Sequence, residues 1–324
     1  MIKAAIIGMG RWGQVLVDSV QGKSDAIVFT AGVTRTVSRA SEYAERQGFP
    51  IGDDYDAVLA DRDIDAVVLA TPHSQHAEQI DKAAAAGKHI FVEKPFTLTS
   101  ASAAQAVAVA DAAGIVLALG HNRRFMPSRA ELKTRIDSGA VGTLLHVEGT
   151  FSGSGGLKAQ AGNWRGNRLE NPAGGMGAMG IHMVDLMIGL FGPIADVRCI
   201  SRQRAVMVDI DDTTSMLFTF ESGMTGTLVT LGATVPTQRI QVFGTKGSAE
   251  IRQERYFEFR PVEGEAQSID FGPFDKEKAE LEAFAAAIAG NAPYPVPAGE
   301  AIHGIAVFEA IVKSAASGTV EAVA

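Results

Sequence analysis

Short apolar runs alternate with helical patterns along the first 120 residues of the chain. The run 66–70 is apolar at every position, which is typical of a strand buried on both faces of a parallel sheet. Within segment 12–20, Val15, Leu16 and Val20 recur at helical spacing and share one face. The strands expected on this basis are 4–7, 27–33, 66–70, 89–92 and 115–119, and the expected helices are 12–20, 37–47, 75–86 and 100–113. This repetition predicts an α/β domain with a doubly wound parallel sheet and helices on both of its faces.

The pattern changes after about residue 120, where strand-like runs replace the strand–helix repeat. The expected strands are 144–151, 196–202, 214–220, 225–231, 239–243, 249–252 and 256–260, and the expected helices are 128–138, 176–191, 276–289 and 300–317. Segments 221–223 and 245–247 are short enough for hairpin turns. We therefore expect a first domain at 1–122 and an α+β domain at 123–324 with a large, mainly antiparallel open sheet. The C-terminal helix is a candidate to pack back on the first domain.

The composition is that of a folded protein, with 46% hydrophobic and 20% charged residues among 324. The formal net charge of -8 argues against nucleic acid as a partner, because nucleic-acid binding requires basic clusters. No apolar run reaches the roughly 18 residues that a membrane span requires, and residues 1–10 lack the features of a signal peptide. The single cysteine, Cys199, excludes an intrachain disulfide framework and a multi-cysteine metal site. We expect a cytoplasmic protein without a metal.

A glycine-rich segment follows the first expected strand and opens the first expected helix. It consists of Gly8, Met9, Gly10, Arg11, Trp12 and Gly13, a G-x-G-x-x-G pattern. The first glycine permits a tight turn, the second lets the backbone approach a pyrophosphate, and the third lets the helix pack closely on the strand. The amides at the helix N-terminus then face the phosphate charge. The segment predicts a dinucleotide-binding domain of the Rossmann type; the competing interpretation is a glycine-rich turn without a ligand.

The end of the second expected strand bears on which nicotinamide cofactor is bound. NAD-binding domains usually place a carboxylate there, about 20 residues past the glycines, to bind the ribose 2′-hydroxyl. This chain has Thr34, Arg35 and Thr36, with Arg39 close behind, and no carboxylate between residues 25 and 42. A guanidinium and hydroxyls suit the 2′-phosphate of NADP, so NADP is the predicted cofactor. NAD is the alternative, in which Arg35 is only a solvated surface charge.

A lysine follows the expected strand 89–92. Glu93, Lys94 and Pro95 come directly after it, and ligands of open α/β sheets bind outside the carboxyl ends of the strands. A lysine at that place can hydrogen-bond a substrate hydroxyl and take part in proton transfer. The competing interpretation is an ordinary surface lysine after a strand.

Several motifs, in this order along the chain, resemble the Gfo/Idh/MocA family, which includes glucose–fructose oxidoreductase and inositol dehydrogenases. They are the glycine pattern, Thr71-Pro72 with His76, Glu93-Lys94-Pro95, Asn163-Trp164-Arg165, and the run from Gly174-Gly175 to Gly180-Ile181-His182-Met183-Val184-Asp185. The resemblance covers essentially the whole chain, including the change to a β-rich second half. It implies an oxidoreductase that transfers hydride between a nicotinamide and a CH–OH carbon of a small molecule.

The resemblance also implies roles for individual residues. Lys94 corresponds to the family's substrate-binding and proton-relay lysine, and His182 to its catalytic histidine, which accepts the proton of the alcohol. The positions that correspond to the surroundings of the cofactor are Thr71, Pro72, Glu93, Trp164 and Arg165. We expect the glycine-rich turn, Lys94 and His182 to open onto one shared crevice.

Histidines and arginines near expected strand ends and in the second half are further candidates. His73 and His76 follow the strand 66–70 and are predicted to border the cofactor, although His76 also suits a cap of the next helix. The candidates for binding a substrate carboxylate bidentately are Arg123, Arg124 and Arg168. The same arginines suit cofactor phosphates or an interface, and these alternatives stay open.

One position departs from the family pattern. Ala178 stands four residues before His182, where family members usually carry an aspartate. Alanine cannot orient a polyol by hydrogen bonding, so carboxylated ring compounds join sugars and cyclitols as candidate substrates. Its presence also leaves open a non-catalytic NADP-binding regulator, while retention of both Lys94 and His182 favours an enzyme. The family's sheet often pairs between subunits, which implies a homodimer or homotetramer formed through the C-terminal sheet.

Overall fold

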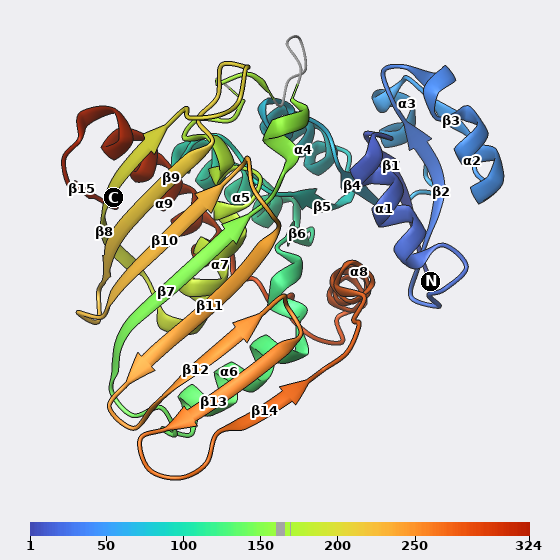
Figure 1. Cartoon of the computed structure of the whole chain (residues 1–324). Helices are drawn as coiled ribbons and strands as arrows, with labels where there is room; N and C mark the ends of the chain where they lie inside the picture. The colour runs from blue at the N-terminus through green and yellow to red at the C-terminus, as the bar shows by residue number, and fades with distance from the viewer. Residues whose placement is uncertain (160–165, 169) are drawn as a thin grey trace. The chain divides into compact units, whose positions relative to one another are not determined.

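The chain forms two compact units (Figure 1). The computed structural model describes residues 1–159, 166–168 and 170–324. The first unit comprises Met1–Asn122 and Asp275–Ala301, and the second comprises Arg123–Phe274 and Ile302–Ala324. The chain thus leaves the first unit after Asn122 and returns to it once, in a segment that sequence periodicity assigned to the second half.

The first unit is built on a six-stranded parallel sheet. Its strands are β1 (Ile2–Ile7), β2 (Ile27–Val33), β3 (Ile51–Gly52), β4 (Ala66–Leu69), β5 (His89–Glu93) and β6 (Leu117–Gly120). Its helices are α1 (Arg11–Val20), α2 (Ser41–Gln47), α3 (Tyr55–Ala60), α4 (His76–Ala85), α5 (Ser100–Ala113) and α8 (Lys276–Ile288), with 3-10 turns η1 (Val37–Arg39) and η2 (His73–Gln75). The strand order β3-β2-β1-β4-β5-β6 confirms the predicted Rossmann sheet.

Helices cover both faces of this sheet because its strands are apolar on both sides. Phe29 and Phe91 point to the face on which Leu16 of α1 and Phe284 of α8 pack. The rings of Phe91 and Phe284 lie 5.9 Å apart between centroids, and burial of each such side chain contributes about 1.5–3 kcal/mol. The buried apolar residues of α4 and α5 are Ile80, Ala83, Ala84, Ala103, Ala106 and Ala110. Helix α8, from the late segment of the chain, therefore completes the core of the first unit.

The second unit is built on a nine-stranded sheet in the order β14-β13-β12-β11-β7-β10-β9-β8-β15. The strands are β7 (Leu144–Ser152), β8 (Ile194–Arg202), β9 (Thr213–Phe220), β10 (Thr225–Leu231), β11 (Thr237–Gly244), β12 (Gly247–Arg252), β13 (Tyr256–Pro261), β14 (Gln267–Asp270) and β15 (Glu321–Ala322). Among the described strands, β7 and β10 pair in parallel and the other neighbours are antiparallel. The predicted mainly antiparallel sheet is confirmed.

Three helices cover one face of the second sheet: α6 (Pro127–Asp137), α7 (Gly180–Phe191) and α9 (Ala298–Ser317), whose first residues belong to the first unit (Figure 1). Met183 and Met187 of α7 pack with Leu228 of the sheet in the core of this unit. The other face carries Ile200 and Leu217, whose exposed fractions are 56% and 52%. Of the helices in the described part of the chain, none has the length and apolarity needed to cross a membrane.

The segment before α7 differs from the expectation. The sequence pattern predicts one helix over 176–191, whereas the structure has a 3-10 turn at Gly174–Met176 and begins α7 at Gly180. Gly174 has φ of +60°, and a Cβ on it would lie 1.9 Å from the carbonyl oxygen of Asp211, so contact with a neighbouring loop sets this backbone. Ala178 consequently lies in an exposed turn outside α7, not one helical turn from His182.

Candidate functional site

The loops that carry the predicted cofactor residues leave the first sheet at one edge. Gly8 follows β1, Thr34 follows β2, Thr71 lies after β4, Lys94 follows β5, and His121 follows β6. Because the strands are parallel, their carboxyl ends meet at the same edge. The order of the strands reverses between β1 and β4, and ligands of open α/β sheets bind at such a point.

The three glycines of the turn after β1 have different surroundings. Gly8 has φ of +101°, and a Cβ on it would lie 2.6 Å from the carbonyl oxygen of Ala70. A Cβ on Gly13 would lie 2.1 Å from the carbonyl oxygen of Gly8. A Cβ on Gly10 would meet no described atom within 4 Å. The fold therefore requires glycine at the first and third positions. At the second position, Gly10, the fold leaves open space, which lets a pyrophosphate approach the backbone closely.

The N-terminus of α1 fits a phosphate. The helix begins at Arg11, no described side chain caps it at Gly10, and its first turn holds no acidic residue. Its first amide groups therefore keep their hydrogen-bonding capacity for an anion. Met9 is buried in the core, 4% exposed, so this residue offers only its backbone. Trp12 is half-buried on the first turn of the helix.

The residues predicted to select the cofactor lie at the carboxyl end of β2. Arg35, Thr36 and Arg39 are exposed, and Thr34 is half-buried. The amide of Thr34 donates to the carbonyl oxygen of Gly52 at 2.9 Å, because β3 pairs with β2. Asp53, which follows Gly52, therefore lies at the end of the strand next to Thr34. The sequence pattern does not indicate this carboxylate, because only the β2–β3 pairing brings Asp53 near Thr34.

The loop after β4 carries Thr71, Pro72, His73 and His76. The hydroxyl of Thr71 donates to Oε1 of Gln79 at 2.5 Å. His73 is 8% exposed, and its ring lies 6.0 Å from that of His76 between centroids. His76 is the first residue of α4 and is 0% exposed. Its ring contacts the loop after β5 as well as its own loop, so His76 links the two loops.

Glu93 lies at the end of β5, with its carboxyl group buried, 5% exposed, and Oε2 accepting from the amide of Lys94 at 3.2 Å. Burial raises the pKa of Glu93 to about 7, against the opposing effects of the Lys94 charge and the Trp12 indole. A Cβ on Gly120 of β6 would lie 2.9 Å from Oε1 of Glu93. Glycine at that position therefore makes room for this carboxyl group, beside the half-buried Lys94.

Helix α8 adds an acidic residue near this edge. Oε1 of Glu277 accepts from the side-chain amide of Asn122 at 2.9 Å. The negative charge of Glu277 also contributes to the raised pKa of Glu93. Sequence reasoning missed Glu277 because nothing in its local pattern indicates that α8 belongs to the first unit.

In the second unit, the predicted catalytic histidine lies on the first turn of α7. His182 is 5% exposed, and its ring lies 6.4 Å from that of Phe151 between centroids. The guanidinium of Arg123 lies over the same Phe151 ring, 4.8 Å from its centroid. Arg123 also forms an ion pair of 3.0 Å with Glu254. Phe151 thus touches two predicted site residues; its apolar strand position gave no sign of this role.

Arg124 forms a buried ion pair with α7. Its Nε and Nη2 donate to the two carboxylate oxygens of Asp185, each at 2.8 Å, and the two side chains are 3% and 4% exposed. A Cβ on Gly189 would lie 1.9 Å from Nη1 of Arg124, so Gly189 makes room for the guanidinium. Asp185 and Gly189 are one helical turn apart on α7, and Arg124 therefore holds the helix that carries His182.

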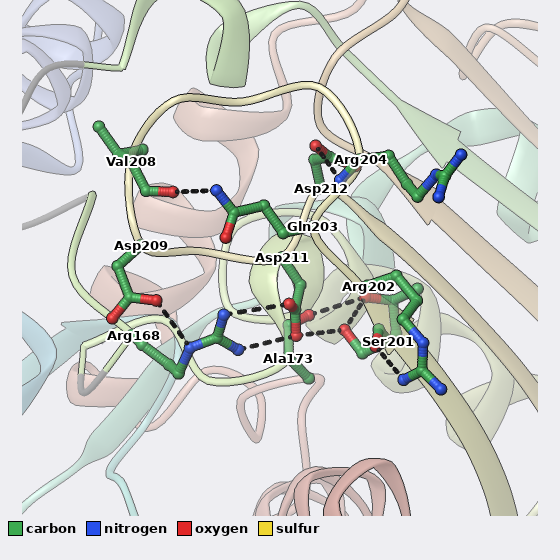
Figure 2. Close-up of polar contacts among 11 residues, drawn as sticks. Arg168, Ala173, Ser201, Arg202, Gln203, Arg204, Val208, Asp209, Asp211 and Asp212 are labelled. Carbon is green, nitrogen blue, oxygen red and sulfur yellow. Dashed lines mark hydrogen bonds and ion pairs between the residues drawn. The ribbon is translucent and has the colours of Figure 1, made fainter.

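Figure 2 shows Arg168 between two aspartates of the loop that joins β8 to β9. Its guanidinium donates to Asp209 at 3.2 Å and to both oxygens of Asp211 at 2.9 and 3.2 Å. The hydroxyl of Ser201 also donates to Asp211, at 2.8 Å. In the same loop, Asp212 accepts three backbone amides, and this donation outweighs burial and lowers the pKa of Asp212 to about 2. The loop is therefore fixed, and carboxylates neutralise Arg168.

The predicted cofactor-contacting pair Trp164 and Arg165, with Asn163, lies outside the described residues. The predicted residues that are described divide between the two units. The first unit brings together the glycine-rich turn, Thr34, Thr71 and Glu93-Lys94 at one sheet edge. The second brings together His182, Arg123 and Arg124, whereas Arg168 pairs with Asp209 and Asp211.

Two family models match the chain. Residues 2–121 match the oxidoreductase family model with an NAD-binding Rossmann fold, and residues 130–250 match the GFO/IDH/MocA C-terminal domain. Among curated proteins, the chain is 30% identical to scyllo-inositol 2-dehydrogenase (NAD(+)) of Bacillus subtilis, over 84% of this chain and 80% of that protein. It is 27% identical to trans-1,2-dihydrobenzene-1,2-diol dehydrogenase of Mus musculus, over 69% of this chain and 66% of that protein.

Solved structures share the fold across both units. A crystal structure from Desulfitobacterium hafniense, of a protein assigned as an NADPH-dependent oxidoreductase, has a TM-score of 0.93 and 27% identity, and covers 99% of this chain and 97% of its own. The match extends from the glycine-rich turn to the nine-stranded sheet, so the arrangement of elements within each unit resembles that of this crystal structure.

Proposed function

The chain belongs to the Gfo/Idh/MocA family of oxidoreductases, and on that premise we propose that it is an NADP-preferring dehydrogenase acting on a secondary alcohol or hemiacetal carbon. The observation that carries the proposal is the open space at Gly10, at the uncapped N-terminus of α1. A glycine that the fold does not require, at a place where phosphate binding is favourable, supports a bound dinucleotide.

The cofactor would be held by loops of the first unit. The residues proposed to hold it are Gly8, Met9, Gly10, Arg11, Trp12, Gly13, Thr34, Arg35, Thr36, Arg39, Thr71, Pro72, His73 and Glu93, with Trp164 and Arg165 from the second domain. Arg35, Thr36 and Arg39 are exposed and suit a 2′-phosphate, which favours NADP. Asp53 at the end of β3 is the feature that favours NAD instead. A bound nicotinamide supplies the hydride chemistry.

Two side chains handle the proton. Lys94, half-buried at the end of β5, donates a hydrogen bond to the reacting substrate oxygen, and His182 accepts the hydroxyl proton as the carbon is oxidised. Phe151 and the Arg124–Asp185 ion pair support this role, because they fix the ring and the helix of His182. The mechanism requires that Lys94 and His182 serve the same substrate molecule.

The substrate is proposed to be a hydroxylated ring without a carboxylate, such as a sugar or cyclitol. Arginines are the predicted donors to a substrate carboxylate, and Arg123, Arg124 and Arg168 each pair with a carboxylate of the protein. The relatives named for scyllo-inositol and for a dihydrodiol support a ring that bears neighbouring hydroxyls. Ala178 leaves a non-catalytic NADP-binding regulator as the second candidate.

The test uses purified protein, NADP⁺ or NAD⁺, and a panel of cyclitols, sugars, a trans-dihydrodiol and carboxylated rings, with absorbance of the reduced nicotinamide as the signal. We expect turnover with a neutral ring, and a loss of about 10²–10⁴-fold in kcat in Lys94→Ala and in His182→Ala. Cofactor binding without turnover on the whole panel identifies the regulator and overturns the enzyme. Turnover confined to carboxylated rings overturns the proposed substrate class.

The open face of the nine-stranded sheet is proposed to pair with a second copy of the chain, giving a homodimer or homotetramer. Ile200 of β8 and Leu217 of β9 are more than half exposed on this face. On β11 of the same sheet, separated from β9 by β7 and β10, Arg239 pairs with Glu148 and Glu250, so both charge signs are available for a self-complementary contact. Leu217→Arg should convert the oligomer to a monomer in light scattering; a wild-type chain that is monomeric contradicts the proposal.

A further inference from the structure

His76 is held by backbone carbonyl groups on both of its ring nitrogens. Nδ1 lies 3.0 Å from the carbonyl oxygen of Pro95 and 3.2 Å from that of Phe96. Nε2 lies 3.1 Å from the carbonyl oxygen of Thr71. The residue is 0% exposed, so these contacts form away from solvent. The ring therefore joins the loop after β4 to the segment that directly follows Lys94.

The chemistry of these partners restricts the state of the ring. A carbonyl oxygen only accepts hydrogen bonds, so a ring nitrogen that bonds to it must carry a proton. A neutral imidazole has one N–H, and its second nitrogen would then turn a lone pair toward a carbonyl oxygen at hydrogen-bonding distance. The imidazolium has two N–H groups and satisfies both sides. A buried charge is costly unless it is hydrogen-bonded and has a counter-charge, and the carbonyl oxygens around His76 supply the hydrogen bonds.

We propose that His76 is a doubly protonated positioning residue that fastens the loop of Lys94 to the loop of Thr71. It acts through the carbonyl groups of Pro95 and Phe96 and so sets the place of Lys94 without touching substrate or cofactor. The predicted effect on kcat rests on the proposed function. The protonation state of His76 and the link between the two loops rest only on the contacts of His76. The burial of the ring favours this role over the expected contact of His76 with the cofactor.

Several titratable groups near the ring influence how favourable a positive charge on His76 is. The ring of His73 lies 6.0 Å away between centroids. Glu78 is exposed on the first turn of α4, and Glu93 and Lys94 directly precede Pro95. His73, Lys94 and the N-terminus of α4 oppose a positive charge on His76, whereas the two glutamates favour it when they are ionised.

The protonation state is measured on the wild-type protein without substrate. The chain has 7 histidines, and with ¹⁵N-labelled histidine a two-bond ¹H–¹⁵N spectrum at neutral pH separates protonated from unprotonated ring nitrogens. His76→Asn identifies the signals by their loss. Two protonated nitrogens for His76 support the proposal, and one unprotonated nitrogen overturns it.

Two conservative variants distinguish the contacts of Nδ1 with Pro95 and Phe96 from the contact of Nε2 with Thr71. The amide nitrogen of Asn occupies roughly the place of Nδ1, and that of Gln the place of Nε2. His76→Asn therefore retains a donor for Pro95 and Phe96, whereas His76→Gln retains one for Thr71. We expect His76→Gln to accelerate hydrogen exchange at the amides of Lys94 and Phe96, and His76→Asn to leave this segment protected. His146→Asn, on β7 of the second unit, is the control.

Kinetics on a substrate found in the panel complete the test. A displacement of about 1 Å at a reacting group costs about 10²-fold, so we expect kcat to fall about 10²-fold in His76→Gln and much less in His76→Asn, with similar KM for NADPH. Equal losses of kcat and equal exchange in both variants would show a merely structural role and overturn the positioning claim. If no substrate is turned over, the proposed function fails, while the nitrogen spectrum and the exchange pattern still decide the link.

Discussion

Gly10→Ala should weaken cofactor binding and leave the stability of the fold nearly unchanged, whereas Gly13→Ala should destabilise the fold. Gly10 has φ of -72° and ψ of -176°, which alanine adopts without strain, and its Cβ would enter open space. The Cβ of alanine at position 13 would lie 2.1 Å from the carbonyl oxygen of Gly8, a backbone atom that cannot move independently. The same added methyl group is therefore tolerated by the fold at position 10 and not at position 13.

The magnitudes follow from these surroundings. At Gly10 the entropy gain of about 0.4–1 kcal/mol offsets the poorer N-cap preference of alanine, about 0.5–1 kcal/mol, so stability changes little. At Gly13 overpacking costs about 1–3 kcal/mol or more, which lowers Tm by about 2–4 °C for each kcal/mol in a unit of this size. A methyl group where the pyrophosphate approaches should weaken NADPH binding at least about tenfold, or ~1.4 kcal/mol.

The assay combines thermal unfolding with NADPH fluorescence titration for the wild type and both variants. We expect Gly10→Ala to unfold within about 4 °C of the wild type, as a change of up to ~1 kcal/mol implies, and to bind NADPH at least about tenfold more weakly. Gly13→Ala should unfold well below both. If Gly10→Ala binds NADPH as tightly as the wild type, the phosphate does not lie at this turn, and the reasoning is refuted.

Three further predictions concern cofactor choice, the buried ion pair and pH. Arg35→Ala should weaken NADPH about 10–100-fold, the worth of a charge-assisted hydrogen bond, and leave NADH nearly unchanged in titrations; equal losses would contradict NADP preference. Asp185→Asn leaves the buried Arg124 without its counter-charge and should cost about 3–5 kcal/mol in urea unfolding; Asp185→Asn of wild-type stability would contradict the account of that pair. Because the pKa of Glu93 is raised from 4.5 to about 7, folded protein binds more protons than unfolded protein between those pH values, and stability should fall as pH rises through that window. Glu93→Gln should flatten this dependence in pH-resolved thermal melts, and an unchanged slope would argue against the raised pKa.

The fold was largely predictable because its signals are local. Helix α5 was expected at 100–113 and spans Ser100–Ala113, since Thr99 and Ser102 form a capping box and Gly114, with φ of 65°, ends the helix. Strand β10 likewise spans the expected 225–231. In contrast, β3 and β15 have 2 residues each and carry no periodic pattern.

The candidate site was only partly predictable, because its contacts connect distant parts of the chain. The sequence indicated Lys94 and His182 but not the partners that fix them. Phe151 looks like any apolar strand residue, yet its ring lies against His182. Asp185 stands near His182 in the sequence, whereas both of its carboxylate oxygens accept hydrogen bonds from Arg124. Pairings of this kind depend on tertiary packing, which periodicity does not encode.

The start of α7 also depends on tertiary contacts that the sequence pattern does not indicate. Apolar spacing continues through Met176, which suggests a longer helix, but Gly174 packs against the backbone of Asp211 and the helix begins only at Gly180. The consequence for function is that Ala178 does not share a helical face with His182.

The central claim, that Lys94 and His182 act on one substrate molecule, is tested most directly by a double-variant cycle in kcat/KM. Groups that act as a unit lose activity non-additively. We therefore expect Lys94→Ala combined with His182→Ala to be about as slow as the slower single variant. Fully multiplicative losses, or turnover that survives in the double variant at the wild-type rate, would contradict the claim.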